Sequence, residues 1–75
     1  MPKLRSISGE RLVRALKRAG FIELRQKGSH VSPGKRTPEK NFRTVVPQHH
    51  TLAKGTLSDI LRQAGLTVEQ LLELL

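Results

Sequence analysis

The sequence predicts a small α+β domain in the order α-β-β-β-α-α, with a three-stranded antiparallel sheet. Apolar residues recur at helical spacing near both ends of the chain, and short strand-like runs occupy the middle. These runs lie too close in sequence for crossover helices, so the strands should form an antiparallel meander. The length of 75 residues allows one domain, and we expect residues 1–75 to form it. A domain this short buries only about 60% of its unfolded surface, so a partner protein or an oligomer could supply further burial.

The first helix is expected to begin after Ser8, a favourable N-cap residue, and to end at Gly20. One side of this helix is apolar and carries Leu12, Leu16 and Ala19. The other side is basic and carries Arg11, Arg14 and Arg18. Such a row of arginines is either a solvated charged face or a surface that contacts the phosphates of a nucleic acid.

Three strand-like runs follow this helix. Residues 21–27 alternate in polarity, and Gly28-Ser29 is a turn signal. A second strand is expected to begin at residues 30–32 and to be stopped or bulged by Pro33-Gly34. Residues 33–41 are expected to form a polar, basic and mobile loop. Residues 42–46 predict a third strand that ends at Pro47.

Two helices are expected after the connection at residues 48–54. Thr56 is the predicted N-cap of the first, which Gly65 ends. Thr67 and Gln70 form a capping box for a short last helix. The chain then ends in a leucine-rich segment that carries Leu71, Leu72, Leu74 and Leu75. This segment either completes the core or is an exposed surface for a partner.

The composition favours a polyanionic partner. Fourteen Lys and Arg against six Asp and Glu give a formal net charge of +8, which points to nucleic acid without distinguishing RNA from DNA. The absence of cysteine excludes disulfides, thiolate zinc sites and a cysteine nucleophile. The chain starts without a signal-peptide pattern and has no apolar stretch near the ~20 residues of a membrane helix. We therefore predict a cytoplasmic protein that does not contact a membrane.

His30 is the strongest catalytic candidate. A lone histidine is usually structural, but the Gly28-Ser29 turn presents this one at the start of a strand. Arg25 and Lys27 precede it and would attract a phosphodiester. An imidazole exchanges protons near neutral pH and could take the proton from a ribose 2′-hydroxyl, which would then attack the adjacent phosphate. DNA lacks this hydroxyl, so the predicted chemistry is specific to RNA.

Other kinds of site find little support. His49 and His50 are adjacent and would point in opposite directions, so at most one faces the site of His30. No three or four histidines or carboxylates have metal-ligand spacing, and we expect neither a metal nor another cofactor. Glycine-rich phosphate loops and a Gly-x-Ser-x-Gly nucleophile elbow are absent from the sequence. Two phenylalanines are too few aromatic residues for a base-stacking sheet.

A series of short segments resembles the HicA (YcfA-like) toxin family of type II toxin–antitoxin systems. The resemblance spans residues 8–75. It rests on Gly20-Phe21, on Arg25-Gln26-Lys27-Gly28-Ser29-His30, on Thr44-Val45-Val46-Pro47-Gln48-His49, on Lys54-Gly55-Thr56-Leu57, and on Ile60-Leu61 with Ala64-Gly65-Leu66. Two features depart from the family pattern: Val31 stands where a second histidine is common, and Pro33-Gly34 falls within the second strand.

The resemblance implies a double-stranded-RNA-binding-like α-β-β-β-α fold with a short extra C-terminal helix. It also implies a metal-independent endoribonuclease (mRNA interferase) that a HicB-type antitoxin binds and masks. The family's catalytic histidine, in a Gly-Ser-His motif, maps onto His30, and the histidine of its Val-Pro-x-His segment maps onto His49. The residues expected to bind RNA or support the site are Arg25, Lys27, Gly28, Ser29, Arg11, Arg14, Arg18 and His49.

Two further expectations concern partners. The chain is expected to oligomerise only through its antitoxin, if at all. The alternative function is a non-catalytic RNA-binding domain with the same fold. A small DNA-binding regulator is a third possibility, for which the sequence offers no convincing recognition helix.

Overall fold

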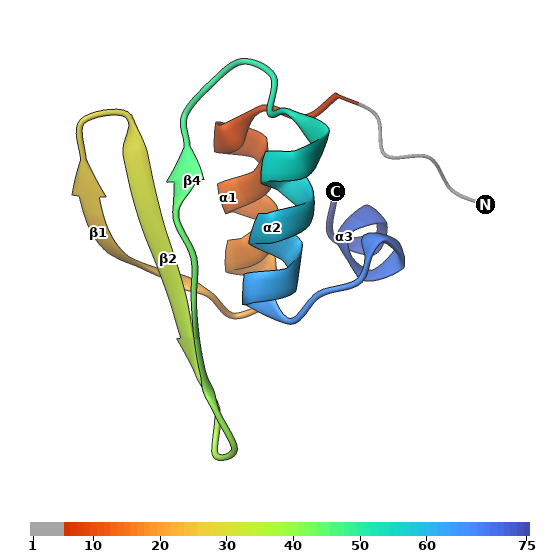
Figure 1. Ribbon diagram of the computed structural model, residues 1–75. Helices are drawn as coiled ribbons and strands as arrows, with labels where there is room; N and C mark the ends of the chain where they lie inside the picture. Colours follow the sequence, from red (N-terminus) through yellow and green to blue (C-terminus); the bar gives the residue numbers. More distant parts are fainter. Residues whose placement is uncertain (1–5) are drawn as a thin grey trace.

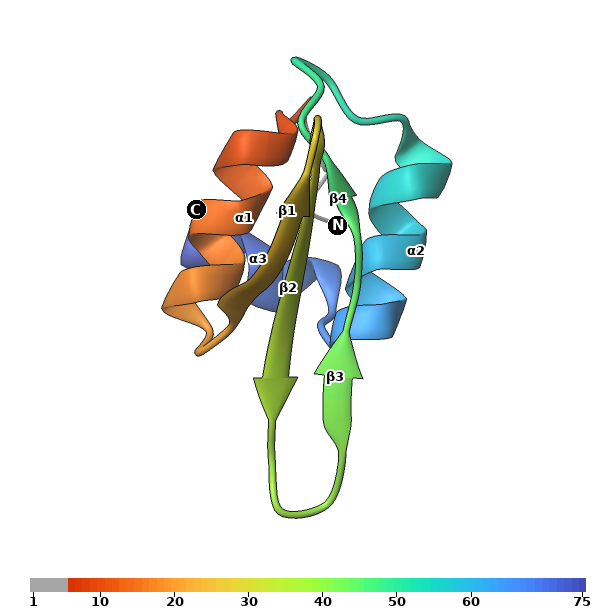
Figure 2. The same cartoon turned by 90° about the vertical axis from the view of Figure 1, so that its left-hand side faces the viewer.

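The computed structural model describes residues 6–75; residues 1–5, which belong to the N-terminal segment predicted to lack a signal peptide, lie outside the described residues. The elements are α1 (Gly9–Arg18), β1 (Ile22–Lys27), β2 (His30–Arg36), β3 (Asn41–Arg43), β4 (Val46–Pro47), α2 (Lys54–Ala64) and α3 (Val68–Leu74). The strands form an antiparallel sheet in the order β1-β2-β3, and β4 also pairs with β2. The helices cover one face of this sheet, and the other face is open (Figures 1 and 2). The predicted α+β class and its α-β-β-β-α order with an extra C-terminal helix are confirmed. The structure has four strands where three were predicted, because the third predicted strand is divided into β3 and β4.

The first helix has the ends that its sequence predicts. The Ser8 side chain accepts a hydrogen bond of 3.1 Å from the Arg11 amide, as an N-cap residue does. Gly20 follows the helix with a φ angle of 96°. Leu12 and Leu16 are fully buried, whereas the arginines of the opposite side are exposed.

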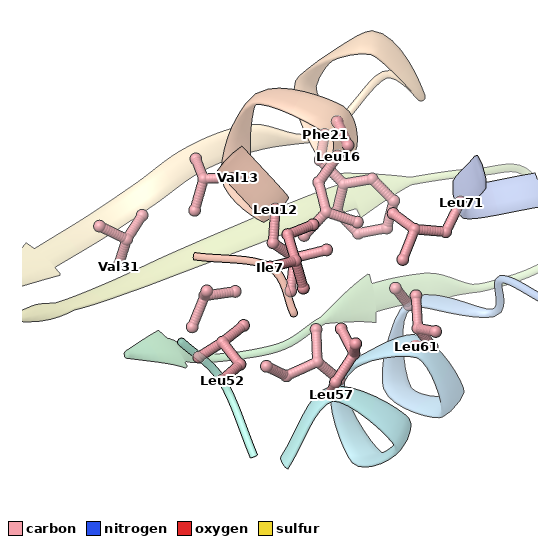
Figure 3. Packing of buried hydrophobic residues seen from close by; sticks show 14 residues of the cluster. Ile7, Leu12, Val13, Leu16, Phe21, Val31, Leu52, Leu57, Leu61 and Leu71 are labelled. Carbon is pink, nitrogen blue, oxygen red and sulfur yellow. The ribbon is translucent and has the colours of Figure 1, made fainter. Parts of the chain in front are cut away.

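The hydrophobic core lies between the sheet and the helices (Figure 3). Every element except β1 and β3 contributes a buried apolar side chain to it, and Phe21 joins it from the segment before β1. The members that Figure 3 labels are Ile7, Leu12, Val13, Leu16, Phe21, Val31, Leu52, Leu57, Leu61 and Leu71. Val31 anchors β2 to this core, one residue after His30.

The second strand does not stop at Pro33-Gly34, as the sequence predicted, but continues from His30 to Arg36. The opposing strand explains this. Glu23 pairs with Pro33 and Arg25 with Ser32, so Leu24 is an extra residue that forms a β-bulge in β1. Proline lacks an amide proton, and here the missing donor falls where the bulge already interrupts the ladder. The Pro33 carbonyl still accepts a 3.1 Å hydrogen bond from the Thr44 amide.

The predicted loop at residues 33–41 is also wrong in extent, because residues 33–36 belong to β2. Residues 37–40 form a tight turn in which the Thr37 amide and hydroxyl both donate to the Lys40 carbonyl, at 2.9 and 2.6 Å.

The third predicted strand is divided at Thr44 and Val45. The buried Thr44 hydroxyl donates to Gln63 of α2 over 2.7 Å, and Pro47 lies within β4 rather than after the strand.

The two C-terminal helices agree with the prediction except at the start of α2. The structure places Ala53 at the N-cap of α2, without a side-chain cap, so the prediction of Thr56 as the cap was wrong. Gly65 ends this helix with a φ angle of 71°, and Thr67 and Gln70 form the predicted capping box of α3. Leu71 is fully buried, and the last leucines pack against the core, so this end of the chain completes the core. No helix within residues 6–75 is long and apolar enough to cross a membrane.

Candidate functional site

A two-residue turn presents His30. Lys27 and His30 form the last pair of the β1–β2 ladder, and Gly28 and Ser29 connect them. Gly28 has a φ angle of 58°, and glycine with positive φ at the first position is typical of such hairpin loops. The sequence therefore predicted this turn correctly. It leaves His30 exposed at the start of β2.

His30 lies on the open face of the sheet. Directly paired residues share one face, and the next pair along the ladder joins Gln26 to Val31, which is buried against the helices. Lys27 and His30 therefore point away from the helices. On its other side, His30 pairs with Pro47 of β4. The imidazole thus stands between a lysine on an edge strand and a proline, with solvent above it.

Backbone hydrogen bonds join the turn to two other segments. The Gln48 amide donates to the Ser29 carbonyl over 2.6 Å, and the Gly9 amide donates to the His49 carbonyl over 2.9 Å. The start of α1 approaches β4 so closely that a Cβ atom at Gly9 would overlap the Pro47 carbonyl oxygen. In Figures 1 and 2, the β1–β2 turn, the loop after β4 and the starts of α1 and α2 lie at the same end of the molecule. This end carries His30 and His49, both exposed.

The charges beside His30 are positive. Arg25 pairs with Ser32, two positions along the ladder from the Lys27–His30 pair, so both cations share the open face with the imidazole. Neither cation forms an ion pair with any residue between 6 and 75. The one acidic residue of β1, Glu23, instead pairs with Lys17 of α1 at 3.2 Å. The surroundings of His30 therefore suit an anionic ligand.

The arginines of α1 form a separate group. Arg11, Arg14 and Arg18 line a shallow depression together with Ser8, Glu10 and Leu75, to which the β1–β2 hairpin contributes no residue. Arg14 pairs with Glu10 at 2.6 Å, and Arg18 donates to the Leu74 carbonyl over 2.6 Å. Arg11 makes no such side-chain contact with the part of the chain that the structure describes. The structure thus places Arg25, Lys27, Gly28, Ser29 and His30 on one hairpin and His49 in the loop whose backbone contacts the turn, whereas the three arginines line a depression on α1.

Two residues that hold the segments around His30 in place were not predicted from the sequence. Gly9 lets α1 contact β4, and Gln48 holds the turn through its amide. A glycine directly after an N-cap serine is a weak signal for the first, because glycine is a poor helix former. The backbone role of Gln48 leaves no signal in the sequence. Among the described residues, no three histidine or carboxylate side chains are grouped as a metal site requires.

The chain resembles a known protein family. The model of a protein family described as the HicA toxin of bacterial toxin–antitoxin systems matches residues 9–66. The match includes the whole sheet, α1, α2 and the Gly28-Ser29-His30 turn, and it ends before α3. No curated protein matches the chain.

Proposed function

The chain belongs to the HicA toxin family of bacterial toxin–antitoxin systems, and we propose that it is an endoribonuclease that cleaves mRNA with His30 as its catalytic residue. Membership of a toxin–antitoxin family implies an antitoxin partner, and we propose that this partner is of the HicB type. The observation that carries the proposal is the exposed position of His30, opposite Lys27 and after a glycine turn, within the matched residues.

The proposed reaction needs only the RNA and the protein. The neutral His30 imidazole takes the proton from a ribose 2′-hydroxyl, and the resulting oxygen attacks the adjacent phosphorus. The bond from phosphorus to the 5′-oxygen breaks, which leaves a 2′,3′-cyclic phosphate on one fragment. The 5′-oxygen of the other fragment takes a proton from His49, Lys27 or water. In the reverse assignment, His30 supplies this last proton as a general acid.

The residues around His30 have supporting roles in this proposal. Lys27 and Arg25 offset the negative charge that grows on the phosphate oxygens. The Ser29 hydroxyl donates to a phosphate oxygen or orients the imidazole, and Gly28 sets the turn. Arg11, Arg14 and Arg18 hold another part of the RNA backbone, because they line a depression on α1 to which the β1–β2 hairpin contributes no residue. Contacts with the backbone position an RNA without specifying its sequence, so we expect loose sequence preference.

Expression of the wild type and of His30→Ala in cells tests the enzymatic proposal. The wild type should stop growth and fragment mRNA, and His30→Ala should do neither while still binding RNA. Growth arrest and RNA cleavage that persist in His30→Ala would exclude His30 as the catalytic residue. A wild type that binds RNA without cutting it would favour a non-catalytic RNA-binding domain. Sequence-specific binding to duplex DNA in a competition gel would favour a DNA-binding regulator.

A further inference from the structure

A depression of about 360 Å³ lies on the open face of the sheet, at the other end of β2 from His30. Its lining includes Ile22 and Leu24 of β1, Gly34 and Arg36 of β2, and Asn41 and Arg43 of β3. We call it the sheet-face depression. It shares no residue with the depression on α1, and no helix covers this face in Figure 2. The sheet-face depression is therefore a second concave surface, separate from the arginines of α1.

The sheet-face depression and the imidazole lie on the same side of β2. Val31 and Pro33 are buried, and the residues that alternate with them, from His30 to Gly34, point away from the helices. The strand between His30 and Gly34 spans about 13 Å at roughly 3.3 Å per residue. An RNA that runs along this strand with a phosphate at His30 therefore places a nearby nucleotide over the depression.

The floor of the sheet-face depression is apolar and open to solvent. Ile22 and Leu24 are 63% and 52% exposed. Ile22 pairs with Gly34, and Leu24 is the extra residue of the β1 bulge. The Leu24 side chain lies over Gly34, where a Cβ atom would overlap it. Proteins that bind an unpaired base hold its face against aromatic or apolar side chains, so this floor suits the face of one base.

The polar side chains beside this floor include two arginines without partners. Arg43 lies on β3 opposite Gly34, and Arg36 lies at the end of β2 on the same face. Neither arginine forms an ion pair or a side-chain hydrogen bond with any residue between 6 and 75. Glu23, the one acidic residue of the strands, pairs with Lys17 of α1 instead. A guanidinium only donates hydrogen bonds, so a ligand here must present acceptors.

We propose that the sheet-face depression binds one unpaired guanine of the substrate RNA, an inference that rests on the proposed function. The base lies against Leu24, and its N7 and O6 atoms accept hydrogen bonds from Arg43. Guanine presents these two acceptors side by side, and the planar fork of an arginine matches them. Adenine carries an amino donor beside N7, from which a guanidinium cannot accept, and the pyrimidines lack N7. Arg36 then contacts a neighbouring phosphate.

A base contact at this place changes the expected sequence preference at one position of the RNA. Contacts between cations and phosphates leave the preference loose elsewhere. Because β2 fixes the separation between His30 and Gly34, the guanine should lie at a constant number of nucleotides from the bond that is cut.

Fluorescence anisotropy with short single-stranded RNAs tests the guanine site in the full-length chain carrying His30→Ala, which should not cut the probe. One RNA has a single guanosine within a run of uridines, and the others have 7-deazaguanosine, adenosine or uridine in its place. The guanosine RNA should bind about tenfold more tightly than the adenosine and uridine RNAs, within the range for one bidentate base contact. 7-Deazaguanosine lacks the N7 acceptor and should weaken binding in the same direction.

Two matched pairs of variants in this chain locate the contact. Arg43→Met should abolish the preference for guanosine, whereas Arg62→Met removes the same charge from α2 and should retain the preference. Leu24→Ala should weaken binding of the guanosine RNA. Val45→Ala truncates an exposed side chain that does not line the depression, and it should bind like the parent chain. All four variants should keep the melting temperature of the parent, since these side chains are exposed.

The other outcomes separate this site from the proposed function. Equal affinity for all four RNAs, or no binding to any, would overturn the guanine site. If Arg43→Met weakens binding equally for all four RNAs and lowers the salt dependence, Arg43 contacts a phosphate and the site is excluded. Cleavage of the guanosine RNA by the wild-type chain is measured separately. A guanosine preference without any cleavage would contradict the endoribonuclease and support the site, whereas cleavage without this preference would do the reverse.

Discussion

Gly28 positions His30 through its backbone conformation and not through side-chain contacts. Its φ angle of 58° lies in the left-handed region, and a Cβ atom at this position would meet nothing within 4 Å. A side chain here would therefore strain the turn without any clash. Because Lys27 and His30 close the ladder on either side of the turn, that strain acts directly on the position of the imidazole.

Gly28→Ala should lower the free energy of unfolding by about 1 kcal/mol, the usual penalty for an L-residue in this conformation. For a domain of this size, that corresponds to a fall of roughly 4–8 °C in the melting temperature. RNA cleavage should also slow, because the imidazole loses its fixed position. Gly55→Ala is the matched control, since a Cβ atom there also meets nothing within 4 Å while the backbone is helical. An equal loss of stability in both variants would contradict this account of the turn.

The elements differ in how far local sequence determines them. Ser8 and the Thr67–Gln70 capping box correctly predicted two helix starts, because an N-cap acts through the residue's own side chain. The start of α2 was missed, since Ala53 leaves no such signal. The continuation of β2 through Pro33 was also missed. It depends on a bulge at Leu24 in the opposing strand, which no pattern within β2 records.

The last helix, α3, is packed into the core through Leu71. The match to the family ends at residue 66, yet Leu71 of α3 is fully buried in the core. Leu71→Ala should therefore lower the free energy of unfolding by about 2–5 kcal/mol, as truncation of a buried leucine does. Leu72→Ala, at a half-buried position of the same helix, should have a much smaller effect. Urea unfolding measures both, and similar midpoints for the two variants would show that α3 does not complete the core.

Across the whole molecule, the charge of +8 is distributed over separate surfaces. The cations beside His30 and the arginines of α1 do not share a depression. The basic character of both groups of cations could be predicted from the sequence, and the Gly-Ser-His motif indicated His30. The sequence could not show that the cations of β1 and the arginines of α1 line different surfaces. It also could not show that the start of α1 is hydrogen-bonded to the loop that carries His49, because both features arise from packing between segments distant in sequence.

This separation predicts the salt dependence of RNA binding. Arg11 has no side-chain partner among the described residues, so it is available to a phosphate. Arg11→Gln should reduce the slope of log affinity against log salt by about 0.7, the value for one phosphate contact on a single strand. Arg62→Gln removes the same charge from α2, where Arg62 pairs with Asp59 at 3.0 Å, and should leave the slope unchanged. Titrations of labelled RNA at several salt concentrations distinguish the two variants, and equal slopes would exclude α1 as an RNA-binding surface.

The single-turnover cleavage rate of purified wild type and His30→Ala on one RNA measures the catalytic role of His30. We expect the rate constant to fall by about 10²–10⁴-fold in His30→Ala, the range for loss of a general acid or base. The affinity for RNA should change little, because the cations on β1 and α1 remain. A His30→Ala protein that cleaves RNA at the wild-type rate would exclude His30 as the catalytic residue.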